Sequence, residues 1–187
     1  YGRYRLSAMA MVSYRNMARE MHETLDSLNN GVHAEEILQH RILTELDLQR
    51  DRFTRIPTIW PTRGRFSSRF GYRRSPFTGA RDFHKGIDIT APTGTEIWAP
   101  ASGKVTYAGR FTSYGIIVEL THGNGIMTRF AHMSRVAVDE GEWVERGDVV
   151  GYVGNTGSSV APHLHYEVHV QGTVNDPMNY ILNTLDK

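Results

Sequence analysis

Two histidines that lie one residue apart, His163 and His165, follow a glycine- and serine-rich turn over residues 154–159. They open a stretch in which apolar and polar residues alternate. Side chains repeat every two residues in a β-strand, so both imidazoles point to the same face. Two adjacent imidazoles do not suit an apolar core, whereas imidazole is a common metal ligand. The pair therefore predicts a metal site whose other ligands come from elsewhere in the chain.

A histidine and an aspartate four residues apart, His84 and Asp88, form the second group that could do chemistry. Gly86 lets the backbone turn between them, so both side chains can reach one point. Ile87 and Ile89 flank Asp88, which places its carboxylate on a largely buried strand where it needs a compensating charge. Taken alone, this pair fits a structural salt bridge as well as a metal site.

Together the two groups contain the ligands of a catalytic zinc site, which has three nitrogen or oxygen ligands and one open position for water. His84, Asp88 and one histidine of the 163/165 pair make such a set. The other histidine would lie near the open position, where an acid or base is useful. His132 follows an expected strand and could supply a further imidazole that binds no metal.

Two more side chains share the strand face of the histidine pair, namely Glu167 and His169. His169 competes as a metal ligand, and Glu167 could orient a ligand histidine or act as a base. If either one closed the fourth position, the zinc would only stabilise the fold. The remaining histidines are interpreted as surface or turn residues: His22, His33, His40 and His122.

The elements that must position these groups lie in the second part of the chain, where glycine is frequent. Six short apolar runs between turns are typical of strands: 87–89, 96–99, 103–108, 115–120, 125–130 and 149–153. Residues 122–125 form a hairpin turn signal. We therefore predict a mainly β domain over residues 57–187, an antiparallel sheet or sandwich large enough for its own core.

The first part of the chain, residues 1–56, differs because it contains two glycines and no proline. Apolar residues recur there at helical spacing: Tyr14, Met17, Met21, Leu25, Leu28, Ala34, Leu38, Ile42 and Leu46. The segment 29–31, Asn-Asn-Gly, is typical of a helix end. We expect two helices, 5–29 and 33–55, that form a helical hairpin or part of a coiled-coil stalk.

Pro57 and Pro61 end the helical segment and begin a linker. The helices could bind a protein partner or form a homodimer. They could also pack across the site and block it, or act as a spacer from a membrane. Comparing the activity of the full chain with that of a chain starting near Pro57 would separate the last two hypotheses.

Composition excludes several classes of protein. The 187 residues are 40% hydrophobic and 22% charged, which is ordinary for a globular protein, and the net charge of +1 does not suggest nucleic-acid binding. Cysteine is absent, so any metal must be held by His, Asp or Glu. No signal peptide and no membrane-spanning run is present, but the chain begins with Tyr1, so a membrane anchor could precede it.

Arginines crowd residues 63–81, and the only acid beside them is Asp82. Such a segment is either a solvated loop face or a rim that attracts an anionic polymer.

The pattern His84-x-x-x-Asp88, an intervening His132 and His163-x-His165 resembles the M23 metallopeptidases, the lysostaphin or LytM-type family. The resemblance covers about residues 60–181 and leaves the helical segment outside. Segments 68–73, 84–95 and 154–167 carry it. The residues at 160 and 161, Val-Ala, stand where the family often has Thr-Gly, a small departure that leaves the metal assignment intact.

The resemblance implies that His84, Asp88 and His165 bind Zn²⁺ and that His132 and His163 are catalytic. We predict His163 as the base or proton shuttle and His132 as the partner of the oxyanion. The implied substrate is the peptide part of peptidoglycan in the cell envelope, with stem-peptide cross-links favoured over glycine bridges. A non-catalytic regulatory or peptidoglycan-binding module is the alternative, although all five residues are kept.

Overall fold

The computed structural model describes residues 8–76 and 78–182 and divides the chain into two compact units, Tyr1–Arg50 and Asp51–Lys187. Helix α1 runs from Ala8 to Thr54; its residues up to Arg50 belong to the first unit and its residues 51–54 to the second. Residues 11–50 are exposed throughout, including the apolar ones. Within the described ranges, no helix combines the length and the apolar composition required to span a membrane.

The structure corrects the expected break in the helical segment, because α1 is one continuous helix where we predicted two. Gly31 lies inside it and does not take the left-handed conformation that a helix cap needs. One glycine costs about 1 kcal/mol in a helix, whereas the helix-forming residues on both sides propagate cooperatively. The hairpin is therefore not formed, and the coiled coil, the homodimer and the partner stay predictions.

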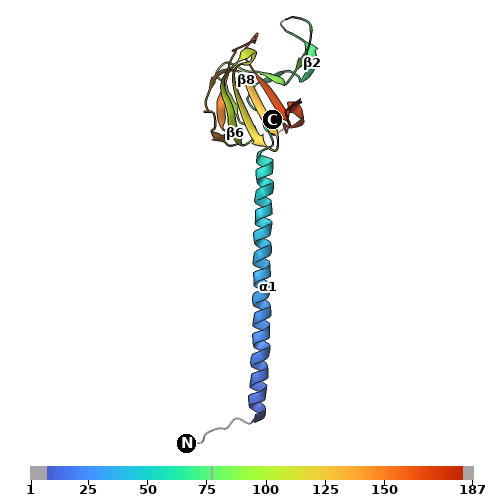
Figure 1. Cartoon of the computed structure of the whole chain (residues 1–187), viewed down its shortest axis with the longest axis vertical. Helices are drawn as coiled ribbons and strands as arrows, with labels where there is room; N and C mark the ends of the chain where they lie inside the picture. The colour runs from blue at the N-terminus through green and yellow to red at the C-terminus, as the bar shows by residue number, and fades with distance from the viewer. Residues whose placement is uncertain (1–7, 77, 183–187) are drawn as a thin grey trace. The chain divides into compact units, whose positions relative to one another are not determined.

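The second unit is a mainly antiparallel β domain, as predicted (Figure 1). Its elements are β1 Arg65–Ser68, β2 Gly71–Arg74, β3 Arg81–His84, β4 Ile87–Thr90, β5 Glu96–Trp98, β6 Gly103–Phe111, η1 Thr112–Tyr114, β7 Gly115–Gly123, β8 Ile126–Val136, β9 Trp143–Val144, β10 Val149–Val153, β11 His163–Val170, β12 Thr173–Asn175 and η2 Pro177–Asn179. The main sheet has the order β1-β4-β11-β8-β7-β6-β9, and β2 and β3 form a separate hairpin.

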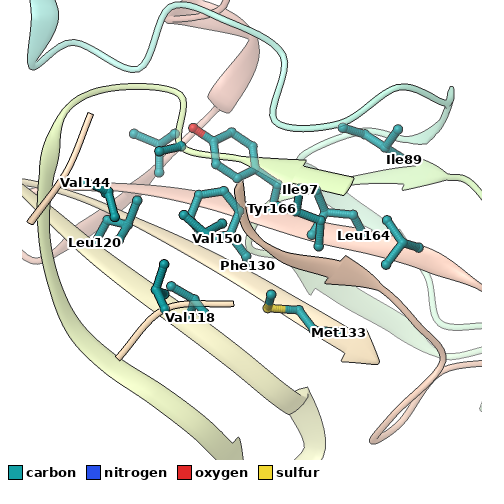
Figure 2. Packing of buried hydrophobic residues seen from close by; sticks show 14 of the residues in the cluster. Ile89, Ile97, Val118, Leu120, Phe130, Met133, Val144, Val150, Leu164 and Tyr166 are labelled. Carbon is teal, nitrogen blue, oxygen red and sulfur yellow. The ribbon is translucent and has the colours of Figure 1, made fainter. Parts of the chain in front are cut away.

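The core lies on one face of β4, β11 and β8. Figure 2 shows Leu164 and Tyr166 of β11 packed with Phe130 of β8, and the rings of Phe130 and Tyr166 lie 5.5 Å apart. Each such fully buried side chain contributes roughly 1.5–3 kcal/mol of transfer free energy. Alternation along β11 then sends His163 and His165 to the opposite face, as the period of two predicts.

Two glycines permit the close approaches that bring the site together. A Cβ on Gly86 would collide with the carbonyl oxygen of Tyr166, so the turn between β3 and β4 lies directly against β11. Gly157 has φ +73° and packs against the backbone of Gly115 at the start of β7. The loop 154–159 is thereby held beside β7, where Thr156 Oγ1 accepts a hydrogen bond from the N–H of Ile116.

Candidate metal centre

Three side chains from three strands converge on one point. His84 ends β3, and Asp88 of β4 lies directly opposite His165 of β11 in the strand register. His84 Nε2 is 3.0 Å from Asp88 Oδ1 and 3.0 Å from His165 Nδ1, and the last two atoms are 2.9 Å apart. All three residues are buried. Across the described ranges, this is the one set of three such residues whose ligand atoms could share a metal ion.

His84 and His165 each use the ring nitrogen that points away from the cluster as a hydrogen-bond donor. His84 Nδ1 lies 2.8 Å from the carbonyl oxygen of Arg69 and donates to it, and His165 Nε2 donates to Glu167 Oε1 over 3.1 Å. The inner nitrogens therefore carry lone pairs when both rings are neutral. Two lone pairs and a carboxylate oxygen about 3 Å apart suit an ion with bonds of about 2.0–2.2 Å, as Zn²⁺ forms.

Charge at this cluster also favours a cation. Burial by itself raises the pKa of Asp88, but hydrogen bonds from His165 and His84 hold it below its usual range. Burial lowers the pKa of His165, yet Asp88 and Glu167 together raise it above the usual value. A proton and a metal ion thus compete for the same inner nitrogen, so metal binding releases protons.

Two further imidazoles, His132 and His163, lie beside the cluster with ring centroids 4.8 Å apart. His132 Nδ1 donates to the carbonyl oxygen of Thr156 over 2.8 Å, and His163 Nδ1 donates to that of Ala161 over 2.7 Å. Each Nε2 is thereby left as the nitrogen that can take or give a proton. His163 Nε2 lies 3.8 Å from Asp88 Oδ1, close to the cluster.

His132 adopts an unusual backbone conformation with φ +59°. A non-glycine residue in this region costs of the order of 1–3 kcal/mol and is often found at functional sites. Burial, the largest effect, together with the charges of His163 and His165, lowers the pKa of His132 to about 4. His132 is therefore a neutral imidazole at neutral pH.

All five residues line one cavity of about 550 Å³. His84, Asp88 and His165 lie together in it with His132 and His163. Its walls also include Tyr114 from η1 and the loop residues 158–162. The cavity is open to solvent on one side and can admit a peptide chain.

Arg73 is a contributor that the sequence did not single out. Its guanidinium donates to Asp88 Oδ2 over 2.8 Å and also to Ser68 Oγ, so Oδ1 is left to the cluster. The sequence did indicate that Asp88 needs a basic partner or a metal. It could not tell which of the crowded arginines reaches Asp88, because that depends on how the β2–β3 hairpin lies against β4.

Glu167 is fully buried and accepts four hydrogen bonds. Besides His165, its donors are Tyr114 Oη at 2.8 Å, Arg129 at 3.0 Å and His169 Nε2 at 2.7 Å. Glu167 thus lies on the outer side of His165, and His169 is bound to Glu167. Among the described residues, neither belongs to the three-atom cluster, so the fourth position is not closed by them.

The other histidines differ from one another. His22, His33 and His40 are exposed on α1, as expected. His122, which we expected in a turn, is instead fully buried in β7 and bonded to Ser102 and Thr128. Strand β7 continues to Gly123, so the turn begins two residues later than the sequence pattern indicated.

Comparison with known proteins gives consistent results. The sequence profile of the family described as Peptidase family M23 matches residues 82–177. The DD-carboxypeptidase/endopeptidase Mpg of Neisseria meningitidis is 44% identical over 120 residues, which are 64% of this chain and 28% of that protein. The chain thus spans little more than a quarter of the length of this relative.

Solved structures agree in fold. The catalytic domain of lysostaphin from Staphylococcus simulans, described as an antimicrobial peptidase, is 30% identical with a TM-score of 0.58 and covers 63% of this chain and 91% of that one. A zinc-containing peptidase from Vibrio cholerae is 31% identical with a TM-score of 0.58 and covers 66% of this chain and 38% of that one.

Proposed function

Since the chain belongs to peptidase family M23, we propose that it is a zinc-dependent endopeptidase that hydrolyses peptide bonds of bacterial peptidoglycan. The observation that carries the proposal is the cavity in which three converging ligand atoms lie beside two imidazoles. His84, Asp88 and His165 would hold the ion with three protein ligands, the number typical of catalytic zinc sites. The substrate places the protein in the cell envelope.

The chemistry of hydrolysis can be assigned to this chain's own groups. When bound, Zn²⁺ lowers the pKa of a water molecule and polarises a carbonyl oxygen. Nε2 of His132 or His163 accepts the proton of the attacking water, because each Nδ1 already donates to a main-chain carbonyl. The protonated ring then donates to the oxyanion or returns the proton to the leaving amine.

The lowered pKa of His132 concerns which imidazole is the proton acceptor and which is the donor to the oxyanion. A ring that stays neutral down to a pH of about 4 keeps a lone pair at Nε2, but it is also a weak base. Either His132 or His163 can therefore be the base, with the other as the donor to the oxyanion. The two assignments are separated by the pH dependence of kcat/KM in single variants of each residue.

We propose stem-peptide cross-links as the bonds that are cut, rather than glycine bridges. The name of the Neisseria meningitidis relative, a DD-carboxypeptidase/endopeptidase, supports this choice. Mass analysis of the muropeptides released from cross-linked cell walls would identify the bond. Cleavage confined to walls with glycine bridges would contradict the preference.

The decisive experiment is digestion of purified cell walls with and without a chelator. We expect soluble muropeptides to be released, release to stop on chelation and to return when Zn²⁺ is added. Asp88→Asn, which removes a ligand charge, should remain inactive after Zn²⁺ addition. A protein that binds the walls but releases nothing with zinc bound would instead be a non-catalytic binding module.

A further inference from the structure

The β2–β3 hairpin has two faces of different chemistry. Its register pairs Tyr72 with Phe83 and Arg74 with Arg81. Because side chains alternate along a strand, these four residues share one face, whereas His84 of the metal centre and Arg73 share the other. Figure 1 shows this hairpin, labelled at β2, standing out from the main sheet. The metal centre uses only one of its two faces.

Aromatic rings organise the second face. Phe83 makes edge contacts with Phe70 at 5.2 Å and with Tyr72 at 5.1 Å. The guanidinium of Arg81 lies 4.1 Å from the centre of the Tyr72 ring, a cation–π contact. Tyr72 is nevertheless 69% exposed. Arg81 is therefore held against a ring that itself faces solvent.

The positive charge on this face is not balanced by the chain. Arg74 and Arg81 lie directly opposite each other, and like charges in this position destabilise a strand pair. Among the described residues, 8–76 and 78–182, no carboxylate lies within ion-pairing distance of the guanidinium of Arg74 or Arg81. Asp82 points to the other face, where it accepts the N–H of Phe83. An anion between the two arginines would remove the repulsion.

A second cavity lies at these arginines. It has a volume of about 470 Å³ and is lined by Tyr72, Arg73, Arg74, Gly79 and Arg81. Arg73 also lines the larger cavity and donates to Asp88. Arg73 is thus the residue that the two cavities have in common.

We propose that the Tyr72–Arg74–Arg81 face of the hairpin binds a free carboxylate of the peptide that is cleaved. The proposal rests on the proposed function for the identity of the ligand. Two guanidinium groups offer paired N–H donors that match the geometry of a carboxylate. The ring of Tyr72 adds an apolar surface for the neighbouring part of the peptide.

The experiment measures binding rather than hydrolysis, so it stands even if the chain does not cut the peptide. A fluorescently labelled cross-linked stem peptide with free carboxylates is titrated with the protein, and anisotropy gives Kd. The same peptide with its carboxylates converted to amides is the second probe. For Arg74→Gln/Arg81→Gln we expect Kd for the carboxylate peptide to rise about three- to tenfold. Kd for the amide peptide should stay the same.

A matched variant, Lys104→Gln/Arg110→Gln, removes two exposed positive charges from β6 and should change neither Kd. Thermal unfolding of each variant shows whether the hairpin keeps its fold. An equal Kd for the two peptides in the wild-type chain would overturn the proposal. A loss of affinity in the hairpin variant that is as large for the amide peptide as for the carboxylate peptide would also overturn it. Where hydrolysis is observed, the hairpin substitutions should raise KM and leave kcat unchanged.

Discussion

His163 and His165 lie on the same face of β11 but use opposite ring nitrogens. His165 donates from Nε2 to a buried carboxylate and turns its Nδ1 to the three-atom cluster. His163 donates from Nδ1 to a main-chain carbonyl and keeps Nε2 for proton transfer. The residue type and the strand face are the same, so the difference comes from the acceptor that each ring meets. A metal ligand and an acid–base group are thus separated by their hydrogen-bond partners.

The largest effect should follow from removing the histidine that serves as a metal ligand, His165. His165→Ala leaves only two of the three ligand atoms, those of His84 and Asp88. We expect zinc to be lost on dialysis and hydrolysis of cell walls to fall to the background rate. Metal analysis by mass spectrometry and release of muropeptides check this. Zinc retained in equal amount with the protein would show that the three-atom cluster is not the metal site.

Removing an acid–base histidine should abolish turnover without affecting zinc binding. We expect His132→Ala and His163→Ala to keep zinc, while kcat falls by about 10²- to 10⁴-fold for the loss of a general acid or base. His40→Ala, on the exposed part of α1, is the matched control and should behave as the wild type. If both active-site variants lost zinc instead, the division of roles would be wrong.

The buried, neutral state of His132 should make stability depend on pH. Its pKa is lowered from 6.5 to about 4 in the folded chain. Between these pH values the unfolded chain binds the proton and the folded chain does not, so stability falls as the pH falls. The full shift corresponds to about 3 kcal/mol. The free energies of unfolding of the metal-free wild type and of His132→Gln, measured with urea, should converge or cross towards pH 4. Parallel curves of this free energy against pH would refute the prediction.

A smaller effect should come from Glu167, which holds the ligand nitrogen in place. Glu167→Gln replaces a charged acceptor for His165 with a neutral amide. We expect zinc affinity to fall by about 10- to 100-fold, the usual cost of losing such a partner. Glu119→Gln is the control, because Glu119 pairs with Arg129 but has no contact with His165. Competition with a chelating dye measures both, and an unchanged affinity in Glu167→Gln would exclude the orienting role.

The helical segment shows where local sequence signals fall short. Asn29, Asn30 and Gly31 favour a helix end, but favouring is a matter of about 1 kcal/mol per residue. Nothing in the contacts of Gly31 forces the chain to turn, since no atom lies within 4 Å of where its Cβ would be. By contrast, the strands of the β domain were predicted because their apolar residues repeat with a clear period and are bounded by turns.

Three short strands were not predicted, namely β2, β3 and β9, with two to four residues each. Strands β4 and β5 are as short but were predicted from their apolar residues between turns. Arg73 and Tyr114 belong to or adjoin such short elements, and both contact the site through residues distant in sequence. Their roles depend on long-range packing, which leaves no mark in the local pattern.

The sequence by itself determined which strand faces carry the residues of the site. The spacing of two fixes His163 and His165 on one face, and the alternation of Ile87, Asp88 and Ile89 turns the carboxylate away from the core. Only the tertiary structure decided which nitrogen each imidazole offers, because a tautomer is set by the nearest acceptor. The carbonyls of Arg69 and Thr156 are brought to His84 and His132 from distant segments by backbone packing that residue types do not encode locally. The acceptors Ala161 and Glu167 lie only two residues from His163 and His165.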